Sequence, residues 1–392
     1  MQYDVIVIGG GMAGLACALG LSHKGFSVVV LDAKKIACQI YLAQQPKRVS
    51  AINHASEEFL TQLGVWQEII QTRAQPYVAM QVWDQHSSAQ LNLQAHAFSQ
   101  PNLGMIVEND LILSTLRSAL LKTNVEIFEE IRIKEISKAT SQGQNNILLE
   151  NGKTLQCKLI IGADGANSFV RDYFQFQYKK TSYEHHAIVA NIKTQKSHQS
   201  TAYQRFLSNG VLAFLPLSDP YLCSIVYSIQ SNKLNDILTL SEIEFSKHLF
   251  VASEAKLGQI ELKSPRMSFE LIERHVDCYY QKAIVVIADA AHTIHPLAGQ
   301  GINLGFADAN VLIEVLAHAK AIHRDIADVS TLAKYERKRR VKNQTMLHTV
   351  QGLKQLFCND NRLLKPLRAL GMNFVNDTYL LKRFFIEKAA GH

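Results

Sequence analysis

The sequence has no unbroken apolar run of 18 or more residues, which is the length that a membrane-spanning helix needs. We therefore expect no transmembrane helix. A signal peptide is not expected either, because the N-terminus lacks a basic region and a cleavage site and carries Asp4 and a glycine cluster. Hydrophobic residues make up 47% of the chain and charged residues 19%, which is the composition of a globular protein.

The six cysteines form no CxxC pair and follow no regular spacing. A disulfide framework and a zinc site are therefore not expected, and the pattern is typical of a reduced, intracellular protein. Lys and Arg outnumber Asp and Glu by 41 to 34, which gives a formal net charge of +7, but no dense basic run is present. We therefore expect a cytoplasmic protein that binds no nucleic acid.

A βαβ unit is predicted at the start of the chain. Residues 3–8 form a short, largely apolar strand, and Gly9, Gly11 and Gly14 follow it in the spacing GxGxxG. A helix and a second apolar strand come next, and Asp32 ends that strand. The glycines would let the backbone approach a pyrophosphate at the helix N-terminus, and the carboxylate would accept hydrogen bonds from a ribose.

This motif alone does not choose between NAD and FAD, and it also fits a glycine-rich turn in an α/β protein without a ligand. Two further motifs follow predicted strands. The first contains Asp164 and is followed by Arg171, and the second covers residues 288–303. Ligands collect at such strand ends in open α/β sheets.

Between the second and third motifs the alternation of strands and helices stops, and short strands predominate from residue 180 to 275. We interpret this stretch as a sheet inserted into the first domain. The predicted division of the chain is a dinucleotide-binding domain at 1–178 and 276–330, an inserted substrate-binding β-sheet domain at 179–275, and a C-terminal helical region at 331–392.

With these motifs the chain resembles the single-component flavin aromatic hydroxylases, and among them the ubiquinone-biosynthesis branch. Residues 288–305, ADAAHTIHPLAGQGINLG, match the GDAAHTIHPLAGQG and NLG block of that branch. Residues 48–56 and 63–66 match its RVSAIN and LGVW elements. Residues 185–190 and 213–225 further resemble the 2-octaprenylphenol hydroxylases of the branch.

The resemblance implies an α/β fold: a Rossmann-like FAD-binding domain of the aromatic hydroxylase type, an inserted β-sheet substrate domain and C-terminal helices. It implies FAD as the cofactor. Because only one GxGxxG site is evident, the electron donor NAD(P)H would bind transiently, without a Rossmann domain of its own. The implied cofactor-binding residues are Gly9, Gly11, Gly14, Asp32, Arg48, Asp164, Asp289, Gly299, Gly301, Ile302 and Asn303.

Within this set, Arg48 would lie by the pyrophosphate or the flavin edge, and Asp289 would bind the ribityl hydroxyls. Reduced flavin is anionic, and a helix that begins near Gly301 would aim its N–H groups at the charged edge of the ring. A plain glycine-rich helix start would explain Gly299 and Gly301, but not the whole string to Asn303.

The chain departs from the family pattern at two positions. Ala288 replaces the glycine that the family carries before Asp289, and we expect a negative φ at Ala288 that still lets the carboxylate reach the ribityl chain. Asp110 stands where relatives often have a basic or amide residue, which weakens the case for a flavin contact there.

The two histidines of the third motif invite a metal or catalytic interpretation. No acid or thiol accompanies them at ligand spacing, so no metal site is expected, and His292 is interpreted as a structural hydrogen-bonding residue. His295, Pro296 and Gln300 are the candidates for residues that face the flavin on the substrate side. No motif residue stands out as an obligatory acid or base, because the flavin would supply the electrophilic oxygen.

The implied function is hydroxylation of the aromatic ring of a polyprenylated phenol in ubiquinone biosynthesis, with ring position 6 of a 2-polyprenylphenol favoured. The alternatives are a sister hydroxylase that acts at another ring carbon, a flavin reductase or halogenase on the same scaffold, and a non-catalytic flavin-binding subunit of a quinone-synthesis complex. With only Trp66 and Trp83, the chain lacks the WxWxIP motif of halogenases.

Apolar and basic residues alternate through the C-terminal region from residue 354 to 388. One interpretation is an amphipathic surface that rests on anionic lipid at the inner face of the inner membrane, near a polyprenyl substrate. The other, slightly favoured, is helices that pack on the core or on another subunit of a homo-oligomer. Other ubiquinone-biosynthesis proteins are further expected partners.

Overall fold

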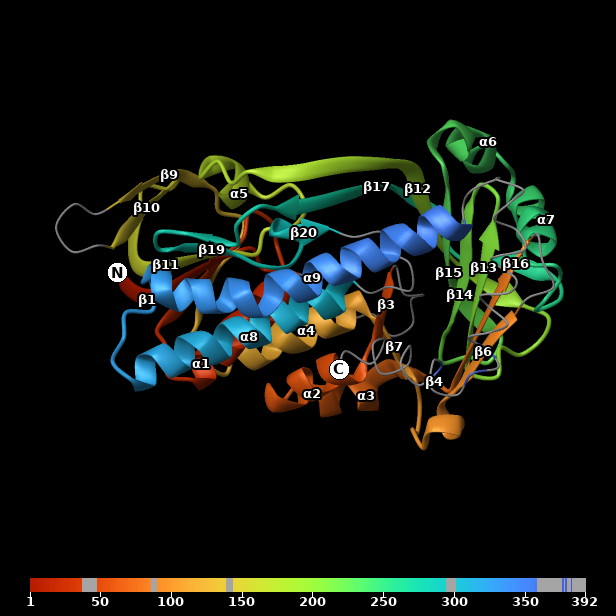
Figure 1. Ribbon diagram of the computed structural model, residues 1–392, viewed down its shortest axis with the longest axis horizontal. Coiled ribbons are helices and arrows are strands. Elements are labelled where there is room, and N and C mark those ends of the chain that lie inside the picture. The colour runs from red at the N-terminus through yellow and green to blue at the C-terminus, as the bar shows by residue number, and fades with distance from the viewer. Residues whose placement is uncertain are drawn as a thin grey trace.

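The computed structural model describes residues 1–36, 48–85, 90–138, 144–293 and 301–357, together with Asn376, Thr378 and Lys382. Two large sheets occupy opposite ends of the molecule, and the strands β12 (Tyr178–Thr194) and β17 (Met267–Val276) extend from one end to the other (Figure 1). No helix among the described residues is long and apolar enough to cross a membrane.

The first sheet is the parallel sheet predicted from the glycine motif. Its parallel strands lie in the order β8-β2-β1-β11-β19, and the short β18 pairs antiparallel with β19 at the edge. The strand bounds are β1 (Gln2–Ile8), β2 (Val28–Leu31), β8 (Glu126–Phe128), β11 (Thr154–Gly162), β18 (Tyr280–Gln281) and β19 (Ile284–Val286). The antiparallel β9 (Ile133–Lys138) and β10 (Asn145–Leu149) extend β11 on the other side.

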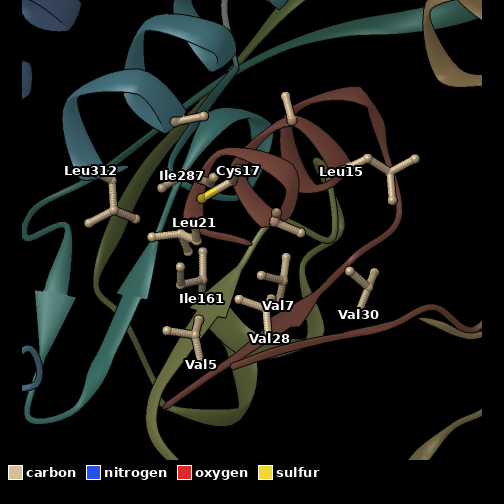
Figure 2. Close-up of a cluster of buried hydrophobic side chains, with 14 of the residues drawn as sticks. Val5, Val7, Leu15, Cys17, Leu21, Val28, Val30, Ile161, Ile287 and Leu312 are labelled. Atoms are coloured by element: carbon tan, nitrogen blue, oxygen red, sulfur yellow. The ribbon is translucent and has the colours of Figure 1, made fainter. Parts of the chain in front are cut away.

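Helix α1 (Met12–His23) packs against this sheet with almost every side chain buried. Its Leu15, Cys17 and Leu21 lie over the β-branched residues of β1 and β2, as Figure 2 shows. The helices α4 (Asn109–Leu120) and α8 (Gly301–Ala321) flank α1. This apolar layer fixes the glycine turn at the start of α1 against the strand ends.

The second sheet is mostly antiparallel and has the order β20-β17-β12-β15-β14-β13-β5-β6, with β16 paired to β12. Its strands β12 to β15 lie at 178–230 and confirm the prediction of short strands in this part of the chain. The remaining strand bounds are β5 (Ala79–Asp84), β6 (Gln90–Gln94), β13 (Thr201–Leu207), β14 (Gly210–Pro216), β15 (Leu222–Gln230), β16 (Ile260–Leu262) and β20 (His292–Thr293).

The sheet is not built from the 179–275 stretch alone. Strand β5 pairs in parallel with β13, and β20 pairs with β17. Both β5 and β20 lie in segments that the sequence assigned to the FAD-binding domain. Alternating apolar residues identify a strand, but they do not identify a partner more than a hundred residues away.

Smaller elements complete the fold. A three-stranded sheet contains β3 (Val49–Ile52), β4 (Ala74–Tyr77) and β7 (Gly104–Glu108). The other helices are α2 (His54–Gln62), α3 (Trp66–Arg73), α5 (Phe169–Tyr173), α6 (Leu234–Leu238), α7 (Glu242–Ala252) and α9 (Val329–Phe357), with short 3-10 turns at 95–98, 231–233 and 288–290. Of the side chains between residues 354 and 388, only those of Asn376, Thr378 and Lys382 are described. The predicted amphipathic surface therefore lies outside the described residues.

Candidate functional site

The glycine turn between β1 and α1 leaves the helix N-terminus open. Gly9 has a φ of +114°, and a Cβ on Gly14 would overlap the carbonyl oxygen of Gly9, so neither position accepts a side chain. Gly11 is the N-cap of α1 and supplies no side-chain cap, and nothing lies within 4 Å of the place its Cβ would take. The first N–H groups of α1 are therefore available to an anion.

Asp32 lies at the end of β2, as predicted, and it holds the glycine turn. Its carboxylate accepts hydrogen bonds from the backbone N–H of Gly10 at 2.5 Å and of Lys34 at 2.7 Å. Each carboxylate oxygen has a second lone pair, which leaves room for the ribose contact that the sequence predicts.

A cavity of about 530 Å³ opens between the ends of the first sheet's strands and one face of the second sheet. The motif side is lined by Gly11, Met12, Ala13, Ala163, Gly165, Ala166, Ala288, Asp289, Thr293, Gly301, Ile302 and Gly305. The opposite side is lined by Val189, Leu215, Ser224, Val226, Phe269, Glu270, Leu271, Ile272 and Arg274, and Arg48, Val49, Ser50 and Asn109 complete the wall. All three predicted strand-end motifs therefore contribute to one cavity.

Charged side chains gather around Asp289 in this cavity. Asp289 faces the open space of the cavity, and among the described residues no hydrogen bond to its carboxylate is present. The surrounding cavity walls desolvate the carboxylate and raise the pKa of Asp289 above its ordinary value, although the charges of His292, Arg48 and Arg274 act in the opposite direction. The Arg48 guanidinium lies 5.0 Å from the centre of the Phe269 ring, between the two halves of the cavity.

Arg274 is a cavity residue that the sequence did not reveal. It is 8% exposed, and its Nη2 lies 3.4 Å from Asn167 Oδ1 in the second motif. It belongs to β17 and pairs with Thr293 of β20, so its position depends on two segments that are adjacent only in the fold. No local spacing marks such a residue.

The prediction of a negative φ at Ala288 is wrong. Its φ is +53°, in the left-handed region that alanine rarely adopts. The backbone N–H of Ala288 donates to Asp308 Oδ2 at 3.0 Å, and the N–H of Ala291 returns to the carbonyl oxygen of Ala288 at 2.9 Å. These tertiary contacts override the local preference, and Asp289 still reaches the cavity.

Asp308 joins this loop to the C-terminal helix. It is fully buried, and besides Ala288 it accepts hydrogen bonds from His292 Nε2 at 2.6 Å, Arg339 Nε at 2.6 Å and Asn343 Nδ2 at 3.0 Å. Burial raises the pKa of Asp308, but the charges and hydrogen bonds of His292 and Arg339 lower it further, to a value well below the ordinary one. His292 thus has the structural role expected of it.

The charged side chains of the second motif shape the loop that carries it. Asp164 Oδ2 accepts the N–H of Val170 at 3.0 Å, and Asp164 is absent from the cavity lining. The Arg171 guanidinium is buried, donates to the carbonyl oxygen of Ala166 at 3.0 Å and lies 4.5 Å from the centre of the Tyr178 ring. The other oxygen, Asp164 Oδ1, is buried and lacks a hydrogen-bond partner among the described residues, so a ligand contact by Asp164 stays a prediction.

In the first turn of α8, some residues line the cavity and one holds a neighbouring strand in place. Gly301 and Ile302 line the cavity, as predicted. The Asn303 side chain does not, because its Nδ2 donates to the carbonyl oxygen of Ala51 at 2.8 Å and its Oδ1 accepts the N–H of Asn53 at 3.1 Å. The side-chain amide thus holds β3 against α8, and the predicted cofactor contact of Asn303 stays a prediction.

Four predicted positions, Gly299, His295, Pro296 and Gln300, lie outside the described residues. Asp110, the second position that departs from the family pattern, is exposed and does not line the cavity, whereas its neighbour Asn109 does. Among the parts of the chain that the structure describes, no group of three His, Cys, Asp or Glu side chains is arranged to hold a metal ion.

The cavity fits a dinucleotide such as FAD. The uncapped start of α1 offers N–H groups for a pyrophosphate, and Asp289 offers a carboxylate without a partner for sugar or ribityl hydroxyls. The Thr293 hydroxyl oxygen, which belongs to a cavity-lining residue, is buried and lacks a hydrogen-bond partner among the described residues. A ligand hydrogen bond at this position would remove the cost of leaving that group unpaired.

Comparison with known proteins agrees with this geometry. The FAD binding domain family matches residues 2–350. The chain belongs to this family. The FAD-binding protein is 31% identical to the mitochondrial ubiquinone biosynthesis monooxygenase COQ6 of Drosophila melanogaster, over 100% of this chain and 90% of that protein. It is 30% identical to the 3-demethoxyubiquinol 3-hydroxylase of Escherichia coli (strain K12), over 99% and 98% of the two chains.

The fold is shared with solved structures as well. The p-nitrophenol 4-monooxygenase PnpA of Pseudomonas putida DLL-E4 superimposes with a TM-score of 0.78 and 18% identity, and the match covers 99% of this chain and 97% of that one. The protein is an FAD-dependent aromatic monooxygenase, which confirms the resemblance seen in its motifs and the predicted fold class.

Proposed function

We propose that this FAD-dependent monooxygenase hydroxylates the aromatic ring of a polyprenylated phenol in ubiquinone biosynthesis, at ring position 6 of a 2-polyprenylphenol. The observation that carries the proposal is the two-sided cavity, in which the cofactor motifs face an apolar sheet wall. The names of the relatives support the pathway, since the fly and bacterial proteins are named for ubiquinone biosynthesis or for hydroxylation of a demethoxyubiquinol.

The sheet wall suits an uncharged ring. It is formed mainly by Val189, Leu215, Val226, Phe269 and Leu271, all on strands of the second sheet. Apolar burial and ring stacking would hold a phenol there and keep water away from the reacting carbon. Because the wall is part of a hydrogen-bonded sheet, the plane of the ring would be held at a fixed place relative to the cofactor.

The motif side of the cavity would hold FAD. The start of α1 would bind its pyrophosphate, Asp289 its ribityl hydroxyls, and Gly301 and Ile302 the edge of its ring. When bound and reduced, FAD activates O₂ and supplies the oxygen atom that enters the phenol ring. The chain's own residues bind the two reactants, orient them and exclude water; no described acid or base needs to act on the ring.

NAD(P)H is the proposed electron donor. The sequence contains one GxGxxG site, and α1 and its turn already serve the FAD site. A nicotinamide donor would therefore bind transiently at the cavity mouth. Anaerobic mixing with NADH or NADPH should bleach the flavin absorbance; a flavin that stays oxidised with both would require another donor.

A sister reaction at another ring carbon is the second candidate, and the 30% identity to the 3-demethoxyubiquinol 3-hydroxylase favours it. Quinone intermediates in a strain that lacks the protein separate the two. Mass spectrometry should find an accumulated polyprenylphenol if the proposal is correct. Accumulation of a methoxylated later intermediate would instead assign the protein to the sister reaction.

Attachment to the inner face of the inner membrane, homo-oligomerisation and contacts with other ubiquinone-biosynthesis proteins stay predictions. The residues on which the membrane contact depends are 354–388, whose side chains lie almost wholly outside the described part of the chain. A non-catalytic subunit would be indicated only by a flavin that never turns over with any prenylphenol.

A further inference from the structure

One polar side chain, that of Ser224, lies among the apolar residues of β12, β14 and β15 that line the cavity. Ser224 of β15 lies directly opposite Leu215 of β14, and both residues line the cavity. Directly opposed side chains of an antiparallel pair share one face of the sheet, as do residues two apart on one strand. Ser224 therefore points to the same side as Leu215 and Val226, toward the space that the proposed function gives to the substrate.

The Ser224 hydroxyl has no hydrogen-bond partner within the described part of the chain. The residue is 1% exposed and lines the cavity, and its oxygen does not belong to the buried side-chain oxygens that lack a partner, so it is open to the cavity. A hydroxyl offers one donor and two acceptor sites, and here they are available to a ligand. An alanine or valine would form this part of the wall without a polar group.

Ser228, four residues further along β15, is a serine whose hydroxyl has a hydrogen-bond partner in the protein. It is 3% exposed, and its hydroxyl oxygen accepts the N–H of Val211 at 3.0 Å. Across the cavity, the Ser50 hydroxyl is also engaged, because it donates to Asn109 Oδ1 at 2.7 Å. Of these three serines, only Ser224 has its hydroxyl free for a ligand.

We propose that the Ser224 hydroxyl binds the ring hydroxyl of the phenol and thereby sets which ring carbon faces the flavin. The inference rests on the proposed function, because it takes the substrate class from it. A single hydrogen bond in this apolar part of the wall fixes the rotation of a flat ring, which stacking alone leaves free. Ser224 is thus a specificity-determining residue for the position that is hydroxylated.

The test compares two short probes that differ in one hydrogen-bond donor: 2-(3-methylbut-2-enyl)phenol and its methyl ether. Dissociation constants are measured by titrating the oxidised, FAD-loaded protein and following the flavin absorbance. Wild type should bind the phenol more tightly than the ether. Ser224→Ala should weaken phenol binding about tenfold, the loss of one neutral hydrogen bond, and change ether binding little.

Ser228→Ala is the matched control, because it removes a hydroxyl from the same strand that is bound to backbone. It should lower the melting temperature and leave both dissociation constants unchanged. Equal phenol affinities of wild type and Ser224→Ala, or an equal loss for phenol and ether, would overturn the role of Ser224 alone. Failure of wild type to bind either probe would instead contradict the proposed substrate class, and the inference with it.

Discussion

The Asp308 carboxylate accepts the backbone N–H of Ala288 at 3.0 Å, and the same oxygen accepts His292 Nε2 at 2.6 Å. One buried side chain on α8 therefore holds both ends of the short loop that carries Asp289 into the cavity. Because Asp308 also binds Arg339 and Asn343 of α9, the loop is fixed to the C-terminal helix as well. The geometry of the cofactor side depends on residues that do not touch the cavity.

Ala288 and Gly305 form a size-matched pair. A Cβ on Gly305 would lie 2.9 Å from the Ala288 Cβ, which is too close for two methyl groups. Gly305→Ala should therefore destabilise the protein by about 1–3 kcal/mol through overpacking and reduce its FAD content. Denaturant unfolding and the ratio of flavin to protein absorbance measure the two effects.

The double variant Ala288→Gly with Gly305→Ala gives the control for this pair. It removes the methyl group that causes the overlap, and glycine at 288 also relieves the left-handed backbone by about 1 kcal/mol. The double variant should regain most of the lost stability and flavin. A change in the double variant equal to the sum of the changes in Ala288→Gly and Gly305→Ala alone would show that the pair is not coupled.

The ion pair between Arg339 and Asp308 should contribute strongly to stability. Its side chains are 5% and 0% exposed and their atoms lie 2.6 Å apart. Arg339→Met would leave the buried Asp308 charge without its arginine partner, so a loss of about 3–5 kcal/mol in unfolding free energy is expected. Arg340→Met is the neighbouring control: its pair with Glu336 is partly exposed, and a loss below about 1 kcal/mol is expected. Similar losses of unfolding free energy in the two variants would contradict the structural importance of the Asp308 ion pair.

Stability should fall as the pH drops from 6.5 to 4, and His275 is one cause. Burial, together with the charges of His292 and Arg340, lowers the pKa of His275 from 6.5 to about 4. In this window the unfolded chain binds a proton that the folded protein does not, so stability decreases with falling pH, by at most about 1.4 kcal/mol per pH unit from this group.

Unfolding free energies at several pH values, compared between wild type and His275→Gln, measure this contribution. The glutamine can keep the hydrogen bond to the Tyr279 hydroxyl, which lies 3.0 Å from His275 Nε2, but it does not titrate. The slope between pH 4 and 6.5 should be smaller in the variant. An unchanged slope would assign the acid sensitivity to other groups.

Asp289→Ala should yield largely colourless protein, because it removes the carboxylate without a described partner that faces the cofactor side of the cavity. Asp32→Ala should weaken FAD binding less, since its ribose contact would be one of many. Asp110→Ala changes an exposed carboxylate outside the cavity lining and should keep its flavin. Full FAD occupancy in Asp289→Ala would show that the third motif has been assigned wrongly.

The three motifs at strand ends were predictable because each is local: a strand, then glycines or an acid at a fixed spacing. The left-handed Ala288 was not, because its conformation is imposed by an acid twenty residues away on another element. Arg274 and Ser224 likewise carry no spacing signal, and only sheet pairing brings them to the cavity. For Asn303 the motif was located correctly, but its helical phase turns the side chain toward β3.

Oxygen incorporation tests the central claim most directly. Purified FAD-loaded protein is incubated with a 2-polyprenylphenol and NADH or NADPH under ¹⁸O₂, and the product is analysed by mass spectrometry. We expect one added oxygen atom on the ring, at position 6, that carries the label from O₂ and not from water. Oxidation of the donor that yields hydrogen peroxide and leaves the phenol unchanged would contradict it.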